Sequence, residues 1–336
     1  MIPDRDHFIW RDAGRIVVFR AGALAAATRL LAEHGFESFD LLSTERALAH
    51  AGDLAAAADE VHEVGPGAVP DTAAAILPAA GSKQLVALGG GRVIDSAKAV
   101  AAISGARVAA IPTTMSGAEM TAIHRLPAGS ESDASGLVRP QLVLADPEPM
   151  TSQPEGPLRA SSMNALAHGA DSLYTPFANP MSEAAALRGA ALIATALDAD
   201  REDRDRAGLA LGSILCGYAI DSGMFALHHV ICQTLVRVLG LPHAETNAAI
   251  LPPAMEAMRE RAPHQTAALA DALGTAPDSL GARIAELGGG PRLGELGADR
   301  GRLDQALDAI EARPELGFTP DPPDRAELGR IIESAW

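Results

Sequence analysis

Three of the ten histidines stand at spacings that suit metal binding or proton transfer. Asn164 and His168 are four residues apart in SSMNALAHGADSLY, so on a helix they share one face. His229 and His243 follow farther along, and Pro242 suits the first position of a helix, which would place His243 near that helix's N-terminus. Imidazole nitrogens bind zinc or iron(II), and three histidines with one oxygen ligand leave an open position for a substrate. The alternative is that these histidines serve only in packing.

A run of three glycines is the second feature with chemical meaning. The segment LVALGGGRVIDSAKAVAAI reads as a strand, a turn at Gly89–Gly91 and a helix that begins near Arg92. Glycines allow positive φ angles and close approach of a ligand, and a helix N-terminus binds anions. The pattern is neither the G-x-G-x-x-G fingerprint nor a P-loop. Asp95 and Lys98 then either orient a ligand or form a surface pair, and a tight turn without any ligand is the alternative reading.

A second polar loop, IPTTMSGAEMT, covers residues 111–121 and follows another apolar run. Thr113, Thr114 and Ser116 supply hydroxyl groups there. In open α/β sheets, ligands bind at the carboxyl ends of the strands, where such loops lie. A Thr/Ser turn that caps the next helix is the alternative.

The elements that must hold these loops alternate in type along the first half of the chain. Short apolar runs predict strands at 15–19, 39–44, 84–88, 107–113 and 141–147, with helical patterns between them. That alternation predicts a parallel, doubly wound sheet whose strands are covered on both faces. A polar, Pro-rich stretch after Pro147 marks a domain boundary. Beyond it only helices are expected, at 158–175, 181–199, 204–221, 224–239, 244–261, 264–273, 302–312 and 324–335. The sequence therefore predicts an α/β dinucleotide-binding domain over 1–150 and an all-α metal or substrate domain over 151–336.

Composition restricts the class of protein. The 336 residues carry a formal net charge of −16, which disfavours binding to nucleic-acid phosphates. The two cysteines are too few for a disulfide framework and are expected to be reduced thiols of a cytoplasmic protein. The N-terminal segment has no apolar core region, so we expect no signal peptide there, and no stretch is expected to span a membrane.

Five motifs stand in the order seen in one enzyme family: GGGRVIDSAK, IPTTMSGAEMT, SMNALAHGADSLY, HHVICQ and LPHAETNAAILP. The chain resembles the iron-containing alcohol dehydrogenase family and, within it, the maleylacetate reductase branch. The resemblance implies a dehydroquinate synthase-like fold, with an α/β nucleotide-binding domain joined to a helical domain. It also implies a homodimer.

The resemblance assigns roles to residues of this sequence. Cofactor contacts fall on Gly89, Gly90, Gly91, Asp95, Lys98, Thr113 and Thr114. The positions of the family's metal ligands are Asn164, His168, His229 and His243, and the metal would be iron or zinc. Several positions depart from the family pattern. An amide at Asn164 replaces a carboxylate, which lowers the expected affinity for a dication, and the other departures are Gln233, Val236-Arg237 and Ala118.

The leading hypothesis is an NAD(P)-dependent oxidoreductase that interconverts a carbonyl and an alcohol in the interdomain cleft. A metal on the histidines would polarise the substrate oxygen. Without a metal, His168, His229 or His243 would transfer the proton, with Asn164 stabilising the alkoxide. Arg237 and Arg159 are candidates for binding a substrate carboxylate. Glu45 would favour NAD through a ribose hydroxyl, whereas Ser43 and Thr44 would accept the 2′-phosphate of NADP, and we favour NAD.

Two other functions remain open from the sequence. The departures at Gln233 and Val236-Arg237 suit a tailoring dehydrogenase that oxidises a hydroxyl on a peptide or another natural product. The same fold also hosts sugar-phosphate cyclases, and a non-catalytic binding protein on this fold is a further alternative.

Overall fold

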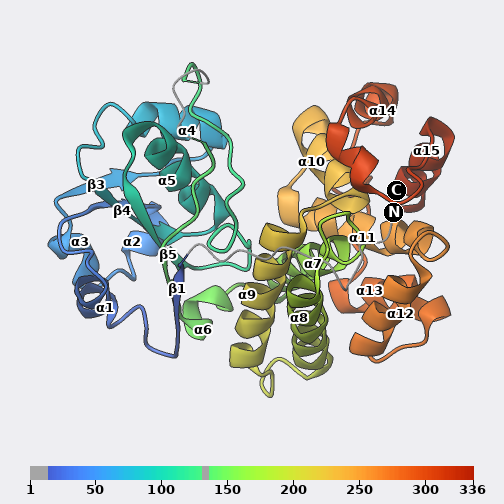
Figure 1. The fold of residues 1–336 in the computed structure, drawn as a ribbon, viewed down its shortest axis with the longest axis horizontal. Coiled ribbons are helices and arrows are strands. Elements are labelled where there is room, and N and C mark those ends of the chain that lie inside the picture. Colours follow the sequence, from blue (N-terminus) through green and yellow to red (C-terminus); the bar gives the residue numbers. More distant parts are fainter. Residues whose placement is uncertain (1–13, 131–135) are drawn as a thin grey trace. The chain divides into compact units, whose positions relative to one another are not determined.

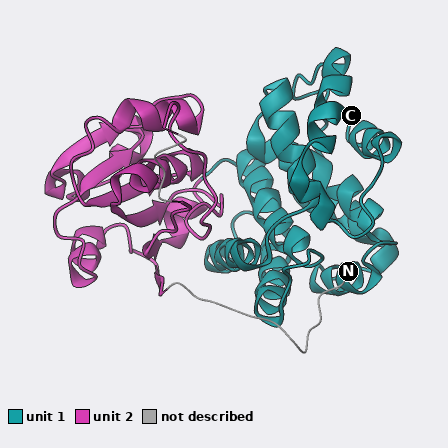
Figure 2. Cartoon of the chain, turned by 45° about the horizontal axis from the view of Figure 1, so that its top comes forward, with its two compact units in different colours: residues 1–10, 153–336 teal, residues 11–152 magenta. Residues whose placement is uncertain are grey.

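The computed structural model describes residues 14–130 and 136–336, so the segment in which we expected no signal peptide lies mostly outside the described residues. The chain divides into two compact units between Ser152 and Gln153 (Figure 2). We call the part before this division the α/β unit and the part after it the helical unit. Each unit is described by itself.

The α/β unit is built on one six-stranded parallel sheet with the order β1-β6-β5-β4-β2-β3 (Figure 1). Its strands are β1 (Ile16–Phe19), β2 (Asp40–Ser43), β3 (Glu60–Glu63), β4 (Gln84–Gly89), β5 (Arg107–Pro112) and β6 (Leu142–Ala145). The helices of this unit are α1 (Ala27–Glu33), α2 (Glu45–Leu48), α3 (Leu54–Ala57), α4 (Val69–Ile76), α5 (Gly91–Ser104) and α6 (Pro147–Met150).

Both faces of the sheet are covered, as the continuous apolar runs predict. In β4, Leu85 and Ala87 belong to a core cluster shared with α4 and α5. The alternate residues Val86 and Leu88 belong to a second cluster shared with α1 and α3. Since successive side chains of a strand point to opposite faces, β4 lies in the middle of a three-layer α/β/α arrangement.

The helical unit contains nine α-helices among the described residues. They are α7 (Glu155–Ser172), α8 (Pro180–Asp198), α9 (Arg206–Gly223), α10 (Leu227–Leu239), α11 (His243–Met258), α12 (Pro263–Ala272), α13 (Leu280–Gly288), α14 (Leu303–Glu311) and α15 (Arg325–Ser334). Short 3₁₀ turns, η1 (Pro277–Ser279), η2 (Arg300–Arg302) and η3 (Pro314–Phe318), connect the later ones. Among the described residues, no single helix is long and apolar enough to cross a membrane; α9 and α10 qualify only as a pair, bent by 100°.

Helix α7 is buried almost all round, which explains why its sequence shows no clear amphipathic stripe. Small residues let its neighbours pack closely. A Cβ added at Gly189 of α8 would lie 2.6 Å from Sγ of Cys216 and 2.8 Å from the carbonyl oxygen of Gly212, both on α9. The backbones of α8 and α9 can therefore approach only because glycine stands there.

The fold class predicted from the sequence, an α/β domain followed by an all-α domain, is confirmed. Two elements differ from the prediction. Strand β3 begins at Glu60, where our prediction has no strand, and Gly52 lies between the short α2 and α3, where a helical pattern was expected. Helix α13 lies in a stretch for which we expected no helix. The strand is a charged edge strand, EVHE, so its sequence lacks the apolar run that marks the others.

Candidate functional site

A fully buried carboxylate organises the histidines of the helical unit. Asp171 lies on α7, three residues after His168, and is 0% exposed. Its Oδ2 accepts the Nδ1–H of His229 at 2.8 Å and two backbone N–H groups, those of Ala226 at 3.0 Å and His229 at 3.1 Å. Its Oδ1 accepts from the Tyr174 hydroxyl. Burial alone would raise the pKa of Asp171, but these hydrogen bonds, above all that from His229, hold it well below its usual range.

These contacts explain how the start of α10 is held. Helix α9 ends at Gly223, and Met224 turns the chain with a φ of 59° before α10 begins at Leu227. The first N–H groups of a helix have no intrahelical acceptor, and Ala226 supplies no side-chain cap. The carboxylate of Asp171 takes that role from a different helix. The first turn of α10 is therefore fixed to α7 by a charged group.

The hydrogen bond to Asp171 fixes the tautomer of His229. With Nδ1 as the donor, Nε2 carries the lone pair, and no described residue hydrogen-bonds to it. The ring stacks on that of His168, with centroids 5.0 Å apart and an interplanar angle of 21°. Nδ1 of His168 also lacks a hydrogen-bond partner among the described residues. Burial, and then the neighbouring His229, His243 and His228, hold the pKa of His168 well below its usual range, so that ring is neutral at pH 7.

His228 has a structural role. Its Nε2 lies 2.9 Å from Oδ1 of Asn247 on α11, and Asn247 in turn donates to the carbonyl oxygen of His243 at 2.7 Å. Burial lowers the pKa of His228 to about 3. His243 is exposed and is the first residue of α11, and Pro242 is the N-cap residue rather than the first helical residue that we predicted. The residue before a helix can hold φ near −65° as well as the first one can, which explains the shift by one position.

The structure brings together part of the predicted metal set. His168 and His229 are adjacent, and Asn164 is buried on α7 one turn before His168. In the described ranges, however, no three His, Cys, Asp or Glu side chains form a group that could hold a metal ion. The metal site of Asn164, His168, His229 and His243 therefore stays a prediction.

The glycine turn lies at the carboxyl end of β4, as predicted, but for a different physical reason. None of Gly89, Gly90 and Gly91 has a positive φ, which corrects our expectation. They are needed for space. A Cβ on Gly89 would lie 2.6 Å from Cγ2 of Val93, and one on Gly91 would lie 2.9 Å from Cβ of Ser116.

Since Gly90 offers no side-chain cap, the first N–H groups of the fourteen-residue helix α5 are left for an outside acceptor. The loop after β5 packs against this turn. Thr113 donates its backbone N–H to the carbonyl oxygen of Gly89 at 3.0 Å, and a Cβ on Gly90 would lie 3.1 Å from the Thr114 side chain. The two loops predicted to bind the cofactor thus form one surface. A dinucleotide pyrophosphate fits this narrow, side-chain-free N-terminus.

Lys98 is turned into the protein, and its predicted contact with the cofactor stays a prediction. Its ammonium is 0% exposed and donates to Oδ1 of Asp95 at 2.7 Å and to the carbonyl oxygens of Ile123 at 2.8 Å and Ala118 at 3.1 Å. These acceptors use its three protons. Lys98 and Asp95 therefore position the end of the second loop and the residues directly after it.

Ser43, Thr44 and Glu45, which were predicted to select between NAD and NADP, lie at the carboxyl end of β2, which pairs with β4. The Ser43 hydroxyl is buried and donates to the carbonyl oxygen of Leu88 at 2.8 Å, so it is not available to a phosphate, contrary to our expectation. Glu45 is exposed at the start of α2. Between Ser43 and Glu45, only Glu45 has an exposed side chain.

Glu119 is a residue of interest that we did not select from the sequence. It lies in the second loop, is fully buried, and neither carboxyl oxygen has a hydrogen-bond partner among the described residues. Burial raises its pKa from the usual 4.5 to about 7, although Lys98 lowers it in part. An acidic residue between Ala118 and Met120 gives no sequence sign of such burial.

The two arginines proposed for a substrate carboxylate have different surroundings. Arg159 donates to Oε1 of Glu155 at 2.7 Å and to the carbonyl oxygens of Leu287 and Leu197 at 2.9 and 3.3 Å. It ties the start of α7 to its neighbours, about 13 Å along the helix axis from His168, and its role in substrate binding stays a prediction. Arg237 is exposed in the last turn of α10, two turns after His229.

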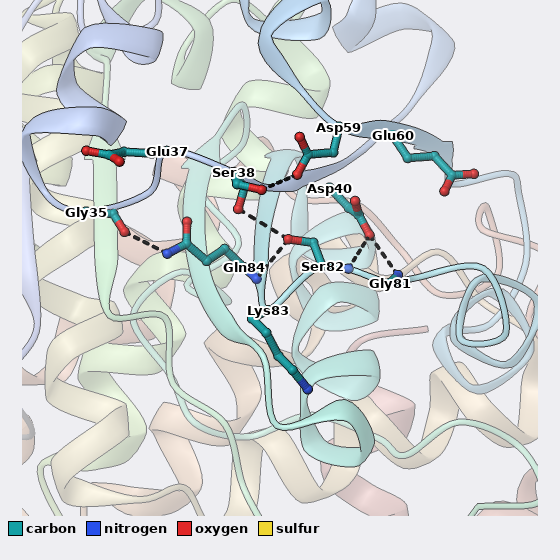
Figure 3. Close-up of a pocket in the computed structure, with 10 residues that line it drawn as sticks. All are labelled: Gly35, Glu37, Ser38, Asp40, Asp59, Glu60, Gly81, Ser82, Lys83 and Gln84. Atoms are coloured by element: carbon teal, nitrogen blue, oxygen red, sulfur yellow. Dashed lines mark hydrogen bonds between the residues drawn. The ribbon is translucent and has the colours of Figure 1, made fainter.

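A groove of about 800 Å³ lies at the opposite ends of the strands (Figure 3). Asp40 and Gln84, the first residues of β2 and β4, line it, together with Glu37, Asp59 and Lys83. The Asp40 carboxylate accepts the backbone N–H groups of Gly81 and Ser82 at 3.0 and 3.1 Å. This groove is separated from the glycine turn by the length of β4, so it is not the cofactor site.

The comparisons with known proteins agree with this geometry. A model described as iron-containing alcohol dehydrogenase matches residues 15–147, and one described as Fe-containing alcohol dehydrogenase family, C-terminal, matches residues 159–336. The chain is 33% identical over 341 residues to maleylacetate reductase of Pseudomonas sp. (strain P51), with 95% of each chain covered. It is 35% identical over 279 residues to maleylacetate reductase 1 of Rhodococcus opacus, which covers 81% of this chain and 78% of that one.

Solved structures give the same result. The maleylacetate reductase from Agrobacterium tumefaciens superposes with a TM-score of 0.85 and 30% identity over 98% of each chain. A putative alcohol dehydrogenase from Ralstonia eutropha JMP134 superposes with a TM-score of 0.88 and 29% identity, again over 98% of each chain. The fold is thus the dehydroquinate synthase-like fold that the resemblance implied.

Proposed function

Since this chain belongs to the iron-containing alcohol dehydrogenase family, whose members act on CH–OH or C=O groups, we propose that it is an NAD(P)-dependent reductase of a small oxoacid. The similarity to maleylacetate reductases over nearly the whole chain supports an oxoacid over a simple aldehyde. The glycine turn and the N-terminus of α5 would hold the pyrophosphate, and the exposed Glu45 favours NAD. When bound, the nicotinamide supplies the hydride for the carbonyl carbon.

The protein must then supply the proton for the carbonyl oxygen. We assign this task to Nε2 of His229. Nδ1 of that ring is hydrogen-bonded to Asp171, whereas Nε2 has no hydrogen-bond partner among the described residues. In the reductive direction, the imidazolium of His229 gives its proton to the oxygen, and the ionised Asp171 stabilises the imidazolium beforehand. In the oxidative direction, Nε2 accepts the hydroxyl proton.

This pair is the observation that carries the proposal. Burying an ionised carboxylate costs free energy unless hydrogen bonds compensate for the lost water. A purely structural role would explain the hydrogen bonds of Asp171, but it would not explain why Nε2 of His229 keeps an unused lone pair. A buried structural histidine would use both nitrogens, as His228 and its neighbours Asn247 and Cys232 illustrate. His168, neutral and stacked on His229, would limit the space around the reacting oxygen.

A divalent metal is typical of the family, but the described residues fit one only in part. Asn164 offers a neutral amide, and no group of three ionisable ligands forms around His168 and His229 in the described ranges. We therefore derive no step through a metal. If a metal binds, the lone pair on Nε2 of His229 is the ligand for it, so chelation and the His229 variant distinguish the two routes.

The test is the oxidation of NADH by maleylacetate, followed by nicotinamide absorbance, for the wild-type protein and His229→Asn. We expect turnover by the wild type, a loss of about a hundredfold or more in kcat for the variant, and similar NADH binding in both. His264→Asn is the matched control, since His264 is an exposed histidine of the helical unit. Turnover of the His229 variant at the wild-type rate would contradict the assignment, and failure of the wild type with every oxoacid would contradict the proposed function.

A further inference from the structure

A guanidinium lies against the face of α10 that carries His229. Arg313 stands between α14 and η3, and its Cζ is 5.9 Å from the centroid of the Phe225 ring. That ring is itself 5.9 Å from the ring of His229. Nη2 of Arg313 donates to Oε1 of Gln233 at 3.1 Å, and Gln233 lies one turn after His229, about 6 Å along the helix axis. The cation is thus held by Phe225 and Gln233, which are both neighbours of the histidine to which we assign the proton.

The charges around Arg313 leave an excess of positive charge. Oε2 of Glu315 lies 2.9 Å from Nε of Arg313. The hydrogen bond from Arg313, and more weakly the charge of Arg237, keep the pKa of Glu315 below its usual range, so Glu315 is ionised. The single negative charge of Glu315 therefore interacts with the positive charges of two guanidinium groups, those of Arg313 and Arg237. A carboxylate of the substrate would supply the second negative charge.

Arg313 also keeps hydrogen-bond donors for such a group. A guanidinium has five N–H groups, and the described contacts of Arg313 use one on Nε and one on Nη2. Its side chain is 17% exposed, so it is shielded from water but not sealed. Partners on two sides fix its plane, and a fixed, planar guanidinium with unused N–H groups is suited to two-point binding of a carboxylate.

We propose that Arg313, oriented by Gln233 and Phe225, binds a carboxylate of the substrate and so selects oxoacids over neutral carbonyl compounds. The substrate class is an oxoacid whose carboxylate lies a few bonds from the reacting carbonyl, because Gln233, which holds the guanidinium, is one helical turn from His229. This inference rests on the proposed function. It assigns the binding of the substrate carboxylate to Arg313 instead of Arg159. Gln233 and Glu315 are positioning residues in this arrangement.

The experiment measures the binding of maleate, an unreactive dicarboxylate, by titration calorimetry with and without NADH. It needs no turnover, so its outcome is separate from that of the activity test. We expect Arg313→Gln to weaken maleate binding about tenfold or more and Arg313→Lys to restore part of it. Arg283→Gln is the matched control, because Arg283 is an equally shielded, ion-paired arginine (15% exposed) of the helical unit that touches no site residue.

Glu315→Gln separates binding from a purely structural role of Arg313. If Arg313 binds the substrate carboxylate, removal of the competing charge of Glu315 strengthens maleate binding about two- to threefold. If Arg313 only fastens η3 to α10, both Arg313→Gln and Glu315→Gln lower the melting temperature and leave maleate affinity unchanged. That second pattern, or the absence of maleate binding by the wild type, would overturn the proposal.

Discussion

Asp171 connects the histidines to the backbone of the helical unit. One carboxylate holds the first turn of α10, the tautomer of His229 and the hydroxyl of Tyr174. We predict that Asp171→Asn lowers kcat about a hundredfold or more, because the amide can neither accept all these N–H groups nor stabilise an imidazolium. Steady-state kinetics with NADH and an oxoacid measure this loss.

Tyr174→Phe is the matched control for that variant. It removes one hydrogen bond to Asp171 and leaves the bond between Asp171 and His229 in place, so we expect kcat to fall by less than about tenfold. Equal losses in the two variants would mean that packing, rather than the carboxylate charge, is what the site needs.

Glu119 gives a prediction about stability and pH. Its pKa is about 7 in the folded protein and 4.5 for the ordinary group, so its contribution to stability is fully present below pH 4.5 and is lost as the pH rises through 7. Glu119→Gln removes this dependence. We expect the variant to be more stable than the wild type by about 3 kcal/mol above pH 7, and nearly equal to it below pH 4.5.

Urea unfolding of the intact protein at the two pH values measures the difference. Glu37→Gln, at an exposed position of the same unit, is the control and should show no such dependence. A Glu119→Gln variant that is less stable than the wild type at high pH would show that the carboxylate has a partner it needs.

At the scale of elements, the turn between β4 and α5 was predictable because three glycines between an apolar run and a helical pattern have few other uses. The reason why glycine is needed at these positions was not predictable, since it depends on Ser116 and Thr114 from a loop that packs against the turn. Strand β3 was missed because it is a short, charged edge strand. The role of Asp171 was missed because it acts on α10, 55 to 58 positions away.

The close approach of the two loops gives a prediction for the cofactor. In Gly91→Ala, the new Cβ would lie 2.9 Å from Cβ of Ser116, so one loop must move away from the other. We expect NADH affinity to fall about tenfold or more, as nicotinamide fluorescence would measure. Gly156→Ala is the control, because a Cβ there has nothing within 4 Å. Unchanged affinity in Gly91→Ala would place the cofactor elsewhere.

At the scale of the whole molecule, we expect the stability of the two units to change with pH in opposite directions. The helical unit holds His228, with its pKa lowered to about 3, and His168, also lowered, so the stability they contribute is present above pH 6.5 and lost below it. Each contributes a loss of about 1.4 kcal/mol per pH unit below 6.5. Glu119 acts in the opposite sense in the α/β unit.

Amide hydrogen exchange of the intact protein separates these responses. Between about pH 8 and about pH 5.5, protection factors corrected for the intrinsic rate should fall for α10 and rise for α5. A parallel change in both helices would contradict the assignment of these groups to their units.

We propose that His229 transfers the proton in this oxidoreductase without a metal, while the ionised Asp171 orients and stabilises its ring. The most direct measurement is kcat for the reduction of maleylacetate by NADH, with metal content determined on the same protein before and after chelation. We predict that kcat does not follow the metal content. Activity that is lost on chelation and returns in proportion to added iron or zinc would contradict the claim and make Nε2 of His229 a metal ligand instead.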